Sequence, residues 1–152
     1  MPIATVTEAR DYILDHFRTH WEETDWDNVF GQVSSAAPAV RYEDVKWDQV
    51  SGNWVWVSVK HADPGNSQQT LGQANGRRYR EFGIVTVQVF CPLGQGLKNN
   101  DKVATVARDI FRGKSAGDDT IEFRTVAVKE IGEAGKWYQT NVTAVFTYDT
   151  VF

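Results

Sequence analysis

Two histidines are the residues of this sequence that could most simply hold a metal ion. His16 and His20 stand four positions apart, which on a helix places both rings on one face at a spacing that suits zinc. Zinc hydrolases with this spacing carry a glutamate directly after the first histidine, whereas this chain has Phe17. The sequence places no third ligand nearby. Two semi-buried histidines on a helix face are therefore the simpler interpretation.

The single cysteine is the residue most able to act as a nucleophile. Cys91 lies between Phe90 and Pro92, and a catalytic cysteine needs an activating histidine, which the sequence does not place beside it. A Gly-x-Ser-x-Gly nucleophile motif is also missing. We expect Cys91 to pack as a small apolar residue at a strand end, and we expect no catalytic residue and no cofactor. A lone cysteine cannot form an internal disulfide, which favours folding in the cytoplasm.

Two glycine-containing loops resemble phosphate-binding turns. Gly94 and Gly96 fit the first two positions of a dinucleotide fingerprint, but Asn99 occupies the third and no βαβ pattern surrounds them. The Gly-Lys-Ser run that begins at Gly113 would need an earlier glycine where Arg108 stands. Both loops are interpreted as turns at helix boundaries.

Composition bounds the fold and excludes several classes of protein. The chain has 152 residues, of which 41% are hydrophobic and 12% aromatic, enough for one core, so we expect a single domain over 1–152. The net charge of −4 lacks the strongly basic footprint of nucleic-acid binders. Residues 1–7 do not resemble a signal peptide, and no apolar stretch predicts a membrane span.

The first 61 residues predict a helix followed by a strand. Thr5 opens a capping box with the glutamate three residues on, and apolar residues then recur at helical spacing over 6–21. Residues 26–38 predict a surface loop, and residues 40–47 predict a short extended piece. Alternating tryptophans and valines predict a strand over 53–61.

The middle of the chain predicts a polar arm that returns as a strand. Residues 62–76 are polar and rich in glycine, with a strand edge at 68–73, and Asn75-Gly76 is a strong hairpin signal. We expect the chain to return at Arg77 and continue as an alternating strand to Phe90, with Pro92 ending it.

The last third predicts a helix and two strands. Asn100 or Asp101 is expected to cap the helix, and Gly113 stands where a helix end favours glycine. Strands at 120–131 and 137–152 are joined by a short turn. The order of elements predicts an α+β fold whose sheet is mostly antiparallel or mixed, with two main helices on one face and a protruding polar β-arm.

The base of the arm is the best candidate for an interaction surface. Arginine and tyrosine are enriched at protein interfaces, and they cluster here. The alternatives are a solvated edge strand whose charges prevent aggregation and a small nucleic-acid patch, which the remaining sequence supports poorly. The expected intersubunit or partner contacts are Gln68, Gln69, Arg77, Arg78, Tyr79 and Arg80.

An ordered set of segments resembles the tail terminator-like proteins of long-tailed bacteriophages. The segments are an arginine-rich strand ending "VFCPLGQG", a helix ending "DIFRG", a strand ending "EIG" and a last strand "WYQTNVTAVFTYD", which together cover residues 77–149. The resemblance rests on their order, because each segment alone is unspecific.

The resemblance implies a structural virion protein rather than an enzyme. Members of this family are small α+β proteins that form a six-fold ring on the tail tube, stop its growth and offer the head connector a surface. The expected partners are other copies of the chain, the tail tube protein and a head–tail connector protein. The expected location is the head-proximal neck of the virion, after assembly in the host cytoplasm. DNA is expected to pass through the lumen without specific binding, and no membrane is involved.

Three alternatives remain open at this point. The nearest is another neck, connector or tail-completion protein. A small hydrolase using Cys91 or the His16 and His20 pair is a second alternative, and a DNA-binding module is a third.

Overall fold

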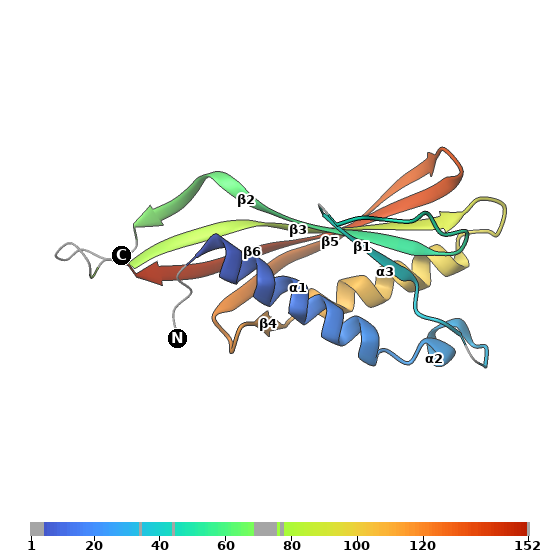
Figure 1. Ribbon diagram of the computed structural model, residues 1–152, viewed down its shortest axis with the longest axis horizontal. Coiled ribbons are helices and arrows are strands. Elements are labelled where there is room, and N and C mark those ends of the chain that lie inside the picture. The colour runs from blue at the N-terminus through green and yellow to red at the C-terminus, as the bar shows by residue number, and fades with distance from the viewer. Residues whose placement is uncertain (1–4, 34, 44, 69–75, 77, 152) are drawn as a thin grey trace.

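A sheet-dominated α+β architecture is seen in the computed structural model, which describes residues 5–33, 35–43, 45–68, 76 and 78–151. Three helices accompany one mixed six-stranded sheet with the order β1-β2-β3-β6-β5-β4, and α1 and α3 lie along one side of it (Figure 1). The elements are α1 (Val6–Glu23), α2 (Trp26–Phe30), β1 (Ala39–Tyr42), β2 (Trp54–Gln68), β3 (Arg78–Pro92), α3 (Lys98–Phe111), β4 (Ser115–Ala116), β5 (Ile121–Ala134) and β6 (Trp137–Val151).

The start of α1 confirms the expected cap. The Thr5 hydroxyl oxygen accepts a hydrogen bond from the Glu8 backbone N–H at 3.1 Å, which satisfies one of the open donors of the first turn. The prediction of a loop throughout 26–38 was wrong for its first part, because α2 forms there. Asp25 caps α2 by accepting from Asn28 N at 3.2 Å, and Gly31 ends it with a φ of 68°, a conformation that favours glycine.

The sheet is antiparallel except at one edge. The short extended piece expected from the sequence is the edge strand β1, which pairs in parallel with β2. β2 is longer than predicted, since it continues as a strand to Gln68 and pairs Gln68 with Tyr79 of β3. Part of the expected arm is therefore strand. The rest of the expected arm, including Gln69 and Arg77, lies mainly outside the described residues.

The second long helix begins earlier than predicted. α3 starts at Lys98, and its N-cap residue Leu97 makes no side-chain cap, so the expectation that Asn100 or Asp101 caps this helix was wrong. Asn100 is instead 1% exposed and faces the sheet. The end of the helix agrees with the sequence: Gly113 follows it with a φ of 68°.

The core lies between the helices and one face of the sheet. Alternate residues of β2, β3 and β6 point into it, so Val57, Val87 and Val142 pack with Phe17 and Phe111 from the helices. Burial of such side chains contributes about 1.5–3 kcal/mol each. This one-sided burial produces the alternation seen in the sequence.

A glycine in β3 allows the strands to approach closely. A Cβ at Gly83 would lie 2.2 Å from the Lys60 carbonyl oxygen and 2.7 Å from the Phe146 ring. No larger residue fits without moving the backbone of β2. Gly83 therefore marks where β2 departs from regular pairing, between His61 and Asn66.

Candidate interaction surface

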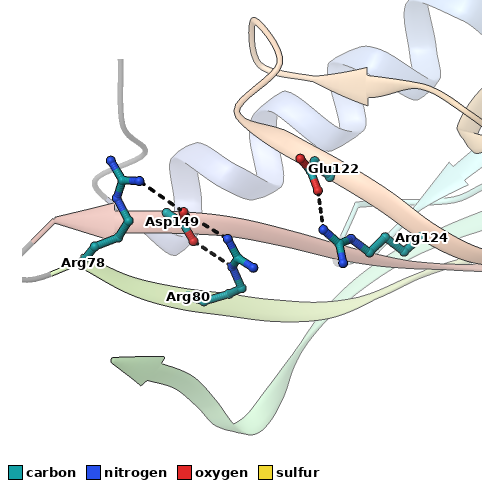
Figure 2. Close-up of polar contacts among 5 residues, drawn as sticks. All are labelled: Arg78, Arg80, Glu122, Arg124 and Asp149. Atoms are coloured by element: carbon teal, nitrogen blue, oxygen red, sulfur yellow. Dashed lines mark hydrogen bonds and ion pairs between the residues drawn. The ribbon is translucent and has the colours of Figure 1, made fainter. Parts of the chain in front are cut away.

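Two arginines at the start of β3 converge on one carboxylate. Arg80 Nε donates to Asp149 Oδ1 at 2.9 Å and Arg80 Nη2 donates to Oδ2 at 3.3 Å. Arg78 Nη1 lies 3.9 Å from Asp149 Oδ2. Figure 2 shows both arginines directed at this carboxylate. Arg80 and Asp149 are directly opposite each other in the register of β3 and β6. The strand register therefore brings the Arg80 guanidinium to the Asp149 carboxylate, because opposed residues of adjacent strands share a face.

The contact with Asp149 holds the guanidinium of Arg80 in place and keeps it charged. The hydrogen bond to Asp149 raises the pKa of Arg80, so it stays charged. Both arginines remain accessible, with side chains 57% exposed for Arg78 and 41% for Arg80, whereas Asp149 is 26% exposed. The pair holds β3 against β6 directly after residues 69–77 and still presents positive charge to solvent.

The structure brings together only some of the residues that the sequence singled out. Arg78 and Arg80 share Asp149, whereas Tyr79, between them in β3, is half-buried on the other face of the sheet. The backbone of Gln68 pairs opposite Tyr79. Gln69 and Arg77 lie outside the described residues. Asp149 is the functional partner that sequence reasoning missed, and the strand pairing needed to find it was not readable from spacing alone.

A second ion pair lies on the same side of the sheet. Arg124 Nη2 donates to Glu122 Oε2 at 2.7 Å, and both side chains are more than half exposed (Figure 2). Exposed pairs of this kind contribute about 0.2–1 kcal/mol to stability. The main consequence of this pair is that it places one positive and one negative side chain on this side of the sheet.

The histidines of α1 are engaged in structural hydrogen bonds. His16 Nε2 lies 2.8 Å from the Ile110 carbonyl oxygen, to which it must donate, and His20 Nδ1 donates to the His16 carbonyl at 2.9 Å. Burial lowers the pKa of His16, which favours the neutral ring. Within the described ranges, no three histidine, cysteine or carboxylate side chains gather in an arrangement that could hold a metal ion.

Cys91 packs in the core, as its position predicted. It is 2% exposed, and burial raises the pKa of its thiol, so the reactive thiolate form is disfavoured. Gly94 and Gly96 both have positive φ, 87° and 74°, in the turn between β3 and α3. The turn connects a strand to a helix, as expected from a loop that lacks the third glycine of the dinucleotide fingerprint.

A buried polar pair joins α3 to the sheet and was missed by the sequence analysis. Thr140 Oγ1 donates to Asn100 Oδ1, and Asn100 Nδ2 donates to the Tyr138 carbonyl at 3.3 Å. These bonds satisfy polar groups that would be costly if left unpaired. Asn100 resembled a helix cap because asparagine is a preferred N-cap residue.

The family model described as phage tail terminator protein matches residues 21–146. The chain belongs to the phage tail terminator family. It is a structural protein of the phage virion, associated with the other components of the tail, and not an enzyme. The resemblance noted in the sequence is thereby confirmed, over a wider range than the segments that suggested it.

One solved structure supports the fold. One chain whose description names no function has a TM-score of 0.54 and 17% identity, covering 89% of this chain and 94% of that chain. A second, described as "Virion of native gene transfer agent (GTA) particle", has a TM-score of 0.48 and 12% identity, covering 94% and 97%, and carries no argument at that score. No curated protein matches. Among the described residues, no helix is long and apolar enough to cross a membrane.

Proposed function

We propose that six copies of this protein form a ring that caps the tail tube at the head-proximal end of the tail. The ring stops polymerisation of the tube protein and provides the surface to which a head–tail connector protein joins. DNA passes through its lumen. The observation that carries the proposal is the family match, which spans residues 21–146 and so includes α2, α3 and most of the sheet.

A closed ring requires a different surface on each side of the protomer. The outer edge of β5 is suited to one side, because β4 pairs only with Ile121 and Glu122. Beyond that pair, the part of the chain that the structure describes has no strand on this edge. Val128 and Ile131 of β5 are 44% and 45% exposed. Exposed apolar residues on an open strand edge favour pairing with another chain.

The opposite side of the protomer is proposed to use the segment from Gln68 to Arg80. The proposed contacts to a neighbouring subunit or to the tube are Gln68, Gln69, Arg77, Arg78, Tyr79 and Arg80. The structural support is Asp149, which fixes Arg80 while leaving it accessible. An arginine held in this way loses less conformational entropy on binding than a free one.

Deletion of residues 69–76 tests the proposal. Native mass spectrometry of the wild type is expected to report six copies, and electron microscopy is expected to show one ring at the end of each tube. The deletion variant is expected to be monomeric and to leave tubes uncapped. A hexamer that still caps tubes would overturn the assignment of this segment.

A paired substitution separates loss of the contact from loss of the fold. Arg78→Ala with Arg80→Ala is expected to weaken the ring, whereas Arg108→Ala with Arg112→Ala removes the same charge from α3 and the residue after it. Circular dichroism should show both variants folded. Equal ring formation by the two variants would contradict the role of the arginines.

A further inference from the structure

The strand register separates the charges of the sheet onto two faces. One row across the sheet runs from β1 through β2, β3 and β6 to β5, and its residues are Arg41, Trp56, Gln88, Asn141 and Lys129. Opposed residues share a face, and this face is the one without helices. We call it the helix-free face.

The helix-free face is basic although the whole chain has a net charge of −4. Among the described residues, the acidic strand residues Glu122 and Asp149 lie on it, and Glu43, which follows β1, adds a third through its contact with Lys60. Six basic residues oppose them, which leaves an excess of positive charge. The basic residues among those described are Arg41, Lys60, Arg78, Arg80, Arg124 and Lys129. Arg78 and Arg80, proposed above as subunit or tube contacts, share Asp149, and the other four still outnumber the two remaining carboxylates of the face.

Each of the three carboxylates on this face is already bonded to a basic side chain. Glu43 lies 3.1 Å from Lys60, Asp149 binds Arg80 and Glu122 binds Arg124. The cations tend to lie outermost: Lys60 is 72% exposed against 33% for Glu43. An approaching polyanion therefore meets positive charge and few unpaired carboxylates.

Many of the uncharged residues of the face are donors of hydrogen bonds, although Phe82, Ile84 and Val145 also lie on it. Hydroxyl and amide side chains fill its middle, and they are half-buried in the sheet surface. This composition is typical of contacts to phosphate oxygens. The residues are Ser58, Thr86, Gln88, Asn141, Thr143 and Thr147.

The first two helices, on the opposite side, are acidic, whereas α3 beside them carries basic residues such as Lys102 and Arg108. Over α1, α2 and the residues between them, six acidic side chains are exposed, and the one exposed basic side chain of that range, Arg18, is bonded to Asp15. The acidic residues are Asp11, Asp15, Glu22, Glu23, Asp25 and Asp27. A net charge of −4 thus hides a protomer with a basic sheet face and an acidic helix.

We propose that the helix-free face lines the lumen of the ring and contacts the phosphate backbone of the DNA that passes through. The inference rests on the proposed ring. Arg41 and Lys129 stand at opposite ends of one row, four strand spacings or about 19 Å apart, so the contacts are spread across the face. Contacts of this kind are independent of sequence and allow sliding along the duplex, which makes a basic lumen compatible with DNA passage.

Double-stranded DNA fits this face better than an acidic protein does. The centre of a protein interface is enriched in buried aromatic or apolar anchors. On the helix-free face, Ile84 is 45% exposed, but Trp54 is buried beneath Trp47, with ring centroids 5.3 Å apart. Trp56 is covered by the Arg41 guanidinium at 3.9 Å. Trp54 and Trp56 are therefore covered in part by neighbouring side chains of the chain itself.

The test measures binding of the full chain to a short labelled DNA duplex by fluorescence anisotropy as salt is raised. The wild type is expected to bind weakly at low salt and to release the duplex as salt increases. Arg41→Gln with Lys129→Gln is expected to weaken binding about tenfold or more and to reduce the salt slope by about 1.8 per bound subunit. Lys102→Gln with Lys114→Gln changes the charge equally on the helix side and should bind as the wild type does.

Native mass spectrometry of the same samples separates this inference from the proposed ring. If the wild-type protein never assembles, the result counts against the proposed ring. The anisotropy measurement with the DNA duplex still decides whether the helix-free face binds DNA. Absence of salt-dependent binding overturns the inference, as does equal loss of binding in both double variants. A ring that dissociates in the Arg41 and Lys129 variant overturns it in favour of a protein contact on this face.

Discussion

The two faces of the sheet are built from alternate residues of the same strands, yet they serve different purposes. On the covered face of β6, Val142, Ala144 and Phe146 are at most 1% exposed, packed against the helices. On the helix-free face their neighbours Thr143 and Thr147 are half-buried, and Asp149 binds two arginines. The covered face stabilises the protomer, and the helix-free face is available for contacts within the virion.

This difference shows that the net charge describes neither face. A charge of −4 lacks the strongly basic footprint of nucleic-acid binders for the chain as a whole. Alternation along a strand sends successive side chains to opposite faces, so charges that cancel in composition are separated in space. In β5, Lys129 lies on the helix-free face opposite Asn141, whereas Glu130 lies on the other face opposite Thr140.

The largest expected effect is on the covered face. Phe146→Ala removes a fully buried ring that packs in the common core, and we expect a loss of about 3–5 kcal/mol in the free energy of unfolding. Thr147→Ala, one residue along, should change it by about 0.5 kcal/mol or less. Urea unfolding of both variants checks the contrast. Similar losses at the two positions would show that the helix-free face also belongs to the core.

A smaller effect is expected where a polar pair fixes α3 to the covered face. Asn100→Ala leaves the Thr140 hydroxyl and the Tyr138 carbonyl without this partner, which should cost about 1–3 kcal/mol. Asn99→Ala, at the neighbouring half-buried position, is the control and should be nearly neutral. Equal stability of the Asn100 variant and the wild type would show that the pair does not hold the helix in place.

A weaker, pH-dependent effect is expected at the end of the covered face. Burial, followed by the nearby charge of Arg10, lowers the pKa of His61, whose Nε2 lies 2.7 Å from the Tyr148 hydroxyl. The unfolded chain therefore binds the proton more tightly, and stability falls as pH drops below about 6.5. Urea unfolding across this range should show a shallower decline for His61→Gln. Since His16 shares the direction of shift, part of the decline should remain, and an unchanged slope would contradict the role of His61.

Local signals predicted much of the fold. The Thr5 cap, the alternation in the long strands and Gly113 after the helix each depend on neighbouring residues, and the structure agrees with all three. The turn between the last two strands was also predicted, although it is only Gly135 and Lys136, because β5 continues to Ala134. The short helix α2 could have been found from Asp25 and Gly31, its cap residues.

Pairing between distant segments could not be predicted in the same way. The parallel contact of β1 with β2 and the burial of Asn100 against Thr140 depend on which strands become neighbours. The same holds for the candidate surface: the arginines of β3 were visible in the sequence, whereas Asp149 lies 69 positions from Arg80. The segregation of charge onto two faces required the register of the whole sheet.

The measurement that tests the account most directly is native mass spectrometry of the purified chain, combined with electron microscopy of tail tubes after it is added. The account predicts assemblies of six copies and a single ring at one end of each tube, with further growth stopped. A chain that stays monomeric in the presence of tubes, or that decorates them along their length without stopping growth, would contradict it.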